Sequence, residues 1–128
     1  MGNWIIALSG VFGAVGVSAG AMGSHVLKTH ISAANFDSFS TATNYLLMHA
    51  IVLLFVGSIV GSARQNVWFK IAGLLLPIGI ILFCGSLLLR SALGCTALVQ
   101  LAPFGGSALI FAWLAICAGG LVNLGRQK

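Results

Sequence analysis

The chain has 128 residues, of which 59% are hydrophobic and only 5% are charged. A soluble domain carries about 25% charged residues, so this composition excludes a water-soluble globular protein and indicates an integral membrane protein. The formal charge of +5 comes from six Lys or Arg residues against one acid, Asp37. These bases are few and flank apolar stretches, which is typical of membrane-helix ends and not of a surface that binds nucleic acid.

Four apolar segments are each long enough to cross a bilayer, which requires about 20 helical residues. They cover roughly residues 3–25, 36–62, 67–90 and 103–124. Backbone polar groups in lipid must be paired within the protein, so helices are expected and open strands are not. The sequence therefore predicts an all-α integral membrane protein. Residues 1–128 are expected to form a single domain, a compact bundle of four transmembrane helices with short loops.

The first segment is rich in very small residues. On a helix of 3.6 residues per turn, one sector of about 80° contains Gly13, Gly16, Gly20 and Gly23. Small residues let membrane helices approach backbone to backbone, so we interpret this face as a packing surface. The helix-packing candidates in the third and fourth segments are Gly85, Gly105 and Gly106.

The second segment contains the strongest candidate for a functional residue. It is expected to begin near Asn35, a good N-cap. His49 lies about ten residues after Phe39, and therefore about 15 Å deep by helix rise. An ionisable side chain at that depth is costly and indicates a functional role by default. Tyr45 lies one turn away on the same face. The alternative is a structural, neutral histidine bonded to Tyr45, to a backbone carbonyl or to Ser86, and both interpretations stay open.

The third and fourth segments carry the two prolines of the chain. Pro77 removes a backbone hydrogen bond and predicts a kink near Gly73. Pro103 suits the first position of a helix. The connection between these segments, residues 91–102, is apolar for a loop, and we expect it to lie along the membrane surface or to pack over the helix ends.

Metal, haem and catalytic sites are not expected. The cysteines are Cys84, Cys95 and Cys117, an odd number without CxxC or metal-ligand spacing. His25 ends the first segment near the membrane surface, whereas His49 lies near the midplane, and this offset of roughly 10 Å argues against a haem shared between them. No set of nucleophile, base and orienting group is recognisable. We therefore predict no cofactor, no metal and no enzymatic activity.

Basic residues predict the orientation in the membrane. Four spans place both termini on the same side as the connection between the second and third segments. That side holds four bases, Arg64, Lys70, Arg126 and Lys128, against Lys28 and Arg90 on the other side, where Asp37 offsets them. The positive-inside rule then predicts that both termini are cytoplasmic.

Several short motifs, taken together, resemble a known family. They are Gly20 to Leu27, Tyr45 with His49 and Ala50, Phe83 to Leu87, and Pro103 to Gly106 with Trp113. In this order they resemble the YgdD-like family of small bacterial inner-membrane proteins, known as domain of unknown function 423 and related to a eukaryotic transmembrane family. The resemblance implies a four-helix, multi-pass protein of the cytoplasmic (inner) membrane. It also implies that His25 and His49 belong to the family pattern, and it brings no established activity.

Two functions from different classes fit these observations. The first is a structural or accessory membrane protein that associates with itself or with a larger membrane complex through small-residue faces. The alternative is a binder or carrier of a small or lipophilic ligand in the outer half of the bundle, near Tyr45, His49 and Ser86, with His25 as a further candidate. The expected partners are the lipid bilayer and other membrane proteins, and no nucleic acid.

Overall fold

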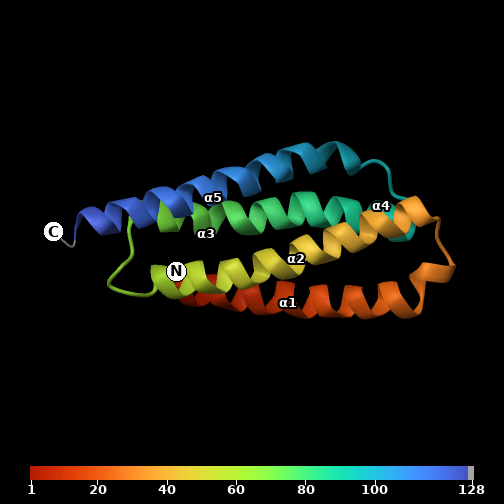
Figure 1. Cartoon of the computed structure of the whole chain (residues 1–128), viewed down its shortest axis with the longest axis horizontal. Coiled ribbons are helices and arrows are strands. Elements are labelled where there is room, and N and C mark those ends of the chain that lie inside the picture. The colour runs from red at the N-terminus through yellow and green to blue at the C-terminus, as the bar shows by residue number, and fades with distance from the viewer. Residues whose placement is uncertain (127–128) are drawn as a thin grey trace.

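The structure, a computed structural model, describes residues 1–126, and these residues form four long helical spans, each antiparallel to the one before it (Figure 1). The spans are α1 (Gly2–His25), α2 (Ala33–Val60), α3 (Val67–Ile80), which continues through a π-helical turn (Ile81–Gly85) into α4 (Ser86–Leu93), and α5 (Ala102–Gly125). Short 3-10 turns lie in two connections, at Leu27–Thr29 and Val99–Leu101. Each span is long and apolar enough to cross a membrane. The predicted all-α, four-span membrane fold is confirmed.

The four spans are arranged as two helical hairpins placed side by side. The most extensive contacts are those of α1 with α2 and of α3 with α5. Across the bundle the order is α1, α2, α3 and α5, so that α1 and α5 lie at opposite outer edges (Figure 1). The most apolar stretches of α2 and of the α3–α4 span are 44% and 39% buried, against 22% in α1 and in α5. The two edge helices therefore leave most of their surface to the surroundings.

Met1, the connection 61–66 and the end of α5 lie at one end of the bundle (Figure 1). This agrees with a chain that crosses the membrane four times. Whether that end is cytoplasmic stays a prediction, and Lys128, one of the bases used for it, lies outside the described residues.

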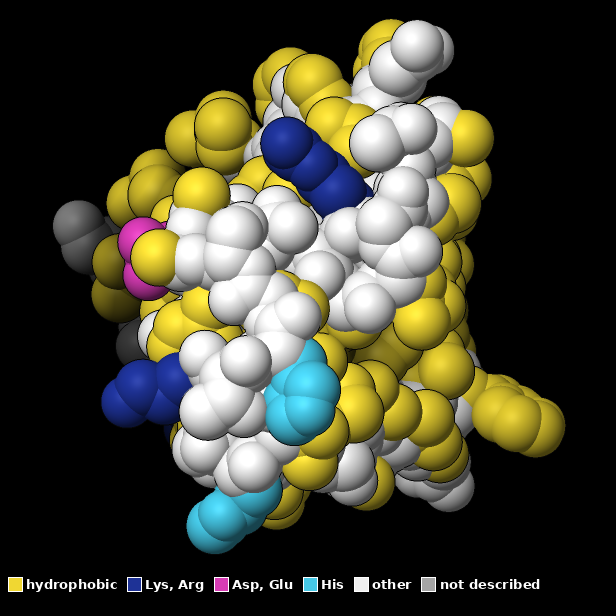
Figure 2. All heavy atoms as spheres, turned by 90° about the vertical axis from the view of Figure 1, so that its right-hand side faces the viewer, with side chains coloured by type: hydrophobic (Ala, Val, Ile, Leu, Met, Phe, Trp, Pro, Cys, Tyr) yellow, Lys and Arg dark blue, Asp and Glu magenta, His cyan; other side chains and the backbone are white. Residues whose placement is uncertain are grey.

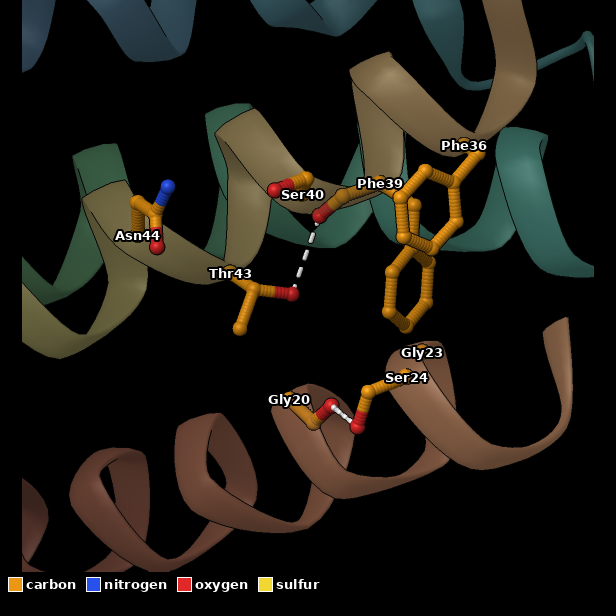
Figure 3. A pocket seen from close by; sticks show the side chains of 8 residues that line it. All are labelled: Gly20, Gly23, Ser24, Phe36, Phe39, Ser40, Thr43 and Asn44. Atoms are coloured by element: carbon orange, nitrogen blue, oxygen red, sulfur yellow. Dashed lines mark hydrogen bonds between the residues drawn. The ribbon is translucent and has the colours of Figure 1, made fainter. Parts of the chain in front are cut away.

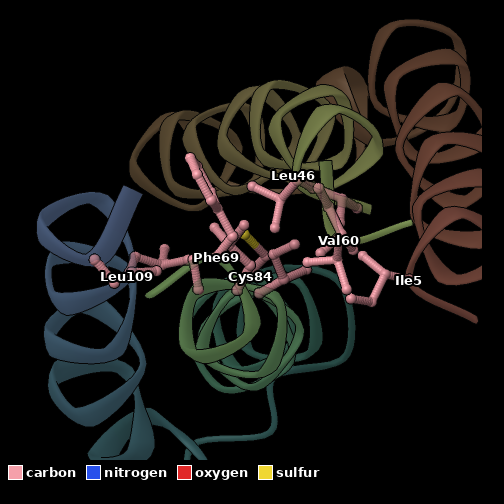
Figure 4. Close-up of a cluster of buried hydrophobic side chains, with 13 residues drawn as sticks. Ile5, Leu46, Val60, Phe69, Cys84 and Leu109 are labelled. Carbon is pink, nitrogen blue, oxygen red and sulfur yellow. The ribbon is translucent and has the colours of Figure 1, made fainter. Parts of the chain in front are cut away.

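The hydrophobic core lies between α2, α3 and α5 (Figure 4). Among its buried members, Ile5 comes from α1 and Cys84 from the π-helical turn, and the half-buried Phe12 and Phe83 pack against it. The buried members are Ile5, Leu46, Leu53, Val56, Val60, Phe69, Ala72, Leu76, Ile80, Cys84, Leu109, Ala112 and Ala115. Most of them are aliphatic or small, which suits close packing of membrane helices.

Two helix boundaries differ from the predicted ones. Ser32 is the N-cap of α2, because its hydroxyl accepts the N–H of Asn35 at 3.3 Å. The prediction of Asn35 as the cap was therefore wrong by one helical turn. The third span continues past Arg90 to Leu93 and ends at Gly94, whose φ of 68° is the left-handed conformation typical of a helix C-terminus. The apolar connection after it is correspondingly shorter.

Asn66 ties the connection between the two hairpins to α5. Its side-chain oxygen caps α3 by accepting two backbone N–H groups of the first turn, at 3.1 and 3.3 Å. Its amide nitrogen donates to the carbonyl of Gly119 at 2.9 Å and to Asn123 Oδ1 at 3.0 Å. Asn123 in turn donates to the carbonyl of Arg64 at 2.7 Å. One 7%-exposed side chain thus starts α3 and fixes the end of α5 beside it.

The glycines of α1 divide into two groups. A Cβ atom at Gly16 would lie 2.7 Å from Leu47 Cδ2, and one at Gly23 would lie 2.9 Å from Phe39 Cε1, so both glycines allow α2 to come close. At Gly20 the nearest neighbour would be at an ordinary contact distance of 3.7 Å. At Gly13 no atom lies within 4 Å. At the start of α1, a Cβ atom at Gly2 would lie 2.7 Å from the backbone oxygen of Gly57. The close approach of α1 to α2 thus depends on Gly2, Gly16 and Gly23.

The closest approach of α5 to the third span is at Gly105. A Cβ atom there would collide with the backbone N of Phe83 and would lie 2.8 Å from the carbonyl carbon of Leu82, both in the π-helical turn. Gly106 has only ordinary contact with the Phe83 ring, at 3.8 Å, and Gly85 has no atom within 4 Å of its Cβ position. The third span therefore departs from α-helical geometry at residues 81–85, one turn beyond Pro77, where the backbone of α5 is in close contact with it. The prediction had placed the irregularity near Gly73.

We predict that Gly105→Ala lowers the free energy of unfolding by about 1–3 kcal/mol, because an added methyl group meets rigid backbone and forces α5 outward. Gly120→Ala is the matched control on the same helix, since Gly120 is exposed and has no atom within 4 Å. Replacing that glycine should leave stability equal or raise it by up to about 1 kcal/mol. Reversible unfolding in mixed micelles, followed by circular dichroism, compares the two. Equal stability of both variants would contradict the close contact.

Candidate functional site

His49 lies near the middle of α2, is 2% exposed, and has both ring nitrogens bonded inside the bundle. Nδ1 donates to the backbone carbonyl of Tyr45, one turn earlier, at 2.8 Å. Nε2 accepts the indole N–H of Trp113 on α5 at 3.2 Å. An indole nitrogen can only donate, so the pair of bonds requires the tautomer with its proton on Nδ1. The imidazole is therefore a neutral link between two helices.

Two aromatic rings contact this imidazole, and a third lies against one of them. The Tyr45 ring stacks on it with a centroid distance of 5.7 Å and an interplanar angle of 26°. The Trp113 ring meets it edge-on, at 6.2 Å and 74°. Phe83, from the π-helical turn, lies 5.3 Å from the Tyr45 ring. Helices α2 and α5 and the π-helical turn thus each contribute to one aromatic cluster.

A cleft of about 460 Å³ opens between α2 and α5 beside this cluster. Its walls are aromatic or aliphatic apart from the imidazole and the Tyr45 hydroxyl, and it is lined by Tyr45, Met48, His49, Phe83, Gly106, Leu109, Ile110 and Trp113. Tyr45 and Trp113 are 41% and 45% exposed at its rim. In a bilayer this opening faces the lipid chains, and we call it the α2/α5 cleft.

Two predicted site residues lie outside this cleft. Ser86 is buried, but its hydroxyl donates to the carbonyl of Phe83 within its own span, at 3.0 Å. Of the possible partners considered for a neutral His49, the structure has the backbone carbonyl and not Ser86. His25 is exposed at the end of α1, whereas His49 lies within the bundle. Among residues 1–126, no group of three His, Cys, Asp or Glu side chains is placed to hold a metal ion.

Sequence reasoning did not identify Trp113 as the partner of His49. The two residues are 64 positions apart, and only the folded arrangement brings their helices together. One signal was present, because tryptophan in membrane proteins prefers the interface and Trp113 lies in the middle of its span. A tryptophan at that depth indicates that its N–H has a partner within the protein.

A second, smaller hollow of about 220 Å³ lies between α1 and α2 (Figure 3). It exists because α1 presents glycines there, and it is lined by Gly20, Gly23, Ser24, Phe36, Phe39, Ser40, Thr43 and Asn44. Ser24 and Thr43 donate their hydroxyl protons to carbonyls of their own helices, at 3.1 and 2.9 Å. Asn44 is exposed, and none of the other lining residues bonds to its amide (Figure 3).

Ionisable side chains gather at the end of the bundle near this hollow. Figure 2 looks onto that end and shows basic, histidine and acidic groups among neutral polar atoms, with hydrophobic side chains along the flanks. The exposed ionisable residues are His25, Lys28, His30, Asp37 and Arg90. This distribution is typical of a bundle end that meets water and lipid headgroups.

We predict that the bond between His49 and Trp113 contributes about 0.6 kcal/mol to stability, and at most about 1.7 kcal/mol. These are the average and the maximum that double-mutant cycles give for hydrogen bonds between membrane helices. A double-mutant cycle with Trp113→Phe and His49→Leu isolates this coupling energy. Trp68→Phe combined with His49→Leu is the control cycle, because Trp68 lies at the start of α3, at the end of the bundle and away from His49. Coupling within error of zero for His49 and Trp113 would show that the two side chains act independently.

Comparison with known proteins confirms the resemblance seen in the sequence. The profile of the family described as "Protein of unknown function (DUF423)" matches residues 19–106, from the last part of α1 to the start of α5. No solved structure matches the chain. The matched segment contains the Tyr45–His49 turn and Gly105, and it ends before Trp113.

Curated relatives extend this match over most of the chain. A UPF0382 membrane protein of Staphylococcus saprophyticus is 35% identical over 104 residues, which cover 80% of this chain and 84% of that protein. A UPF0382 membrane protein of Staphylococcus epidermidis is 36% identical over 101 residues, 78% of this chain and 80% of the relative. The inner membrane protein YgdD of Escherichia coli is 28% identical over 127 residues, 98% and 94% of the two chains. The chain therefore belongs to the DUF423 family, as a multi-pass protein of the cytoplasmic (inner) membrane.

Proposed function

We propose that this protein is a structural or accessory component of the membrane, which acts by associating with itself or with a larger membrane complex and has no enzymatic activity. The observation that carries the proposal is the bonding of His49. Its imidazole is the buried side chain best suited to acid–base or metal chemistry. However, one ring nitrogen is bonded to its own helix and the other to Trp113. A general base or a metal ligand needs a free nitrogen, and here none is free.

The layered arrangement of the helices supports the same function. Because α1 and α5 lie at the edges and do not close on each other, each keeps a wide outward face. On α1 that face carries five small residues within a sector of roughly 80°, opposite the face that meets α2. They are all exposed, and they are Ala7, Gly10, Ala14, Ser18 and Ala21. Small residues at such spacings favour association of membrane helices.

We predict that the protein contains more than one copy, or keeps another membrane protein bound, when it is extracted directly into lipid nanodiscs. Native mass spectrometry of the intact discs measures the mass and counts the copies. The discs are also prepared with increasing amounts of added lipid. Copies that share a disc by chance then separate, whereas specifically associated copies stay together. A strictly monomeric protein without a co-purifying protein, at every lipid ratio, would contradict the proposal.

A second candidate function, binding of a lipophilic molecule from the bilayer, is favoured by the α2/α5 cleft. Its volume of about 460 Å³, its aromatic walls and its opening towards the lipid chains suit a flat or chain-like apolar ligand. His49 would then act as part of the wall, since both of its nitrogens are already bonded.

We predict for this second function that the purified protein retains a lipophilic molecule, which Gly106→Leu displaces. Gly106 lines the cleft, so a leucine side chain there would occupy it. Gly120→Leu, an exposed position on the same helix outside the cleft, is the matched control and should keep the molecule. Extraction into organic solvent followed by mass spectrometry measures the retained compound. Equal retention by both variants would exclude the cleft as the binding site.

A further inference from the structure

The outward face of α2 changes character along its length. On a helix of 3.6 residues per turn, one sector of roughly 80° contains, in order, Asp37, Thr41, Asn44, Met48, Ile51 and Phe55, and Tyr45 lies at its edge. All of these side chains are exposed. The half towards Phe55 is apolar, as expected for a surface that meets lipid. The half from Asp37 to Tyr45 is polar, and we call it the polar face of α2.

The ends of the helices indicate how deep this polar face lies. Trp4 is 78% exposed and Trp68 is 40% exposed, which marks the membrane interface at the end that holds Met1. Gly57 of α2 packs against Ile5 and Ile6 and so lies near the level of Trp4. A hydrocarbon core of about 30 Å corresponds to about 20 helical residues, which leads from Gly57 back to Asp37. Asn44 and Tyr45 then lie about 10 Å inside the hydrocarbon.

Polar side chains at this depth need partners, and the chain itself does not provide them. The side-chain hydrogen bonds in this part of α2 are made by Ser38, Thr43 and His49. Among the described residues, none is made by the side chains of Thr41, Asn44 or Tyr45. An amide without a hydrogen bond is strongly disfavoured in an apolar medium. A lipid-facing position would therefore be the wrong environment for Asn44.

We propose that the polar face of α2 is covered in the bilayer by the same face of a second copy, with the two Asn44 amides hydrogen-bonded to each other. This inference rests on the proposed self-association and assigns its contact surface to α2 instead of the small-residue face of α1. A primary amide has both a donor and an acceptor group, so two copies related by a two-fold axis along the membrane normal can satisfy each other. Lipid chains offer neither group. Polar side chains of this type join membrane helices.

The neighbouring residues are compatible with this contact. Thr41, one turn from Asn44, is small enough to allow a close crossing of the two helices. The Asp37 carboxylates of the two copies would lie about two turns from the crossing point, at the membrane surface, where water and salt screen their repulsion.

The test measures dimerisation by Förster transfer between labelled copies in liposomes, over a series of lipid-to-protein ratios. We expect Asn44→Leu to weaken dimerisation by about tenfold, since polar contacts between model transmembrane peptides contribute about 1–2 kcal/mol. Asn44→Gln keeps the amide and should stay within about threefold of the parent chain. Ser58→Leu is the matched control, because Ser58 is exposed on α2 but bonds its own helix, and it should change nothing.

The variants also separate this contact from the competing one on α1. Gly10→Leu enlarges a residue of the small-residue face of α1, and the proposal expects it to leave the dimer intact. Loss of the dimer in Gly10→Leu but not in Asn44→Leu would overturn the proposed surface while self-association stands. A parent chain that stays monomeric at every ratio would overturn both. Misfolding is distinguishable, because Asn44→Leu replaces an exposed amide by an apolar group and should stabilise the monomer in lipid.

Discussion

The structure depends on one constraint, the high cost of an unpaired polar group in hydrocarbon. Helices satisfy it for the backbone, and most hydroxyl groups in the spans donate to a carbonyl of their own helix, as Ser18 and Thr43 do. Among the described residues, the hydroxyl of Ser91, near the end of α4, is the only buried side-chain oxygen or nitrogen without a partner. Two buried polar side chains instead connect different helices. His49 bonds to Trp113 across the middle of the bundle, and Asn66 bonds to α5 at one end. These links hold together helices that have little hydrophobic reason to associate in lipid.

Much of the fold was readable from the sequence, because each span is an unbroken apolar stretch whose length matches the bilayer. The four helices were predicted within a few residues of their observed ends. The boundaries that differed depend on local capping by Ser32 and on the left-handed conformation of Gly94, which apolar periodicity does not reveal. Similarly, a small residue in a span is a signal for packing, but it does not say against which helix. Gly16 and Gly105 lie against neighbours, whereas Gly13 and Gly85 do not.

The candidate site was readable only in part. Tyr45 and His49 were expected together because they are one turn apart on one helix, and this spacing is set by helix geometry alone. Ser86 and Trp113 both belong to other spans, and their distance from His49 depends on the order of the helices in the bundle. The structure places α5 rather than the Ser86 turn next to the imidazole, and Ser86 is bonded within its own span. Pairing across helices is a property of the whole arrangement, so no local pattern could select the right partner.

The division into two hairpins has a consequence for how the protein is made. The contacts of α1 with α2, and of α3 with α5, join segments that follow each other in the chain, so each hairpin can form as soon as its second span has entered the membrane. The His49–Trp113 bond and the core between α2 and α3 are then established when the two finished hairpins dock. Substitutions at Gly16 and Gly23 would act on the first assembly step, and substitutions at Trp113 on the second. Ribosome-bound intermediates of increasing length would therefore acquire their protease resistance in two separate steps.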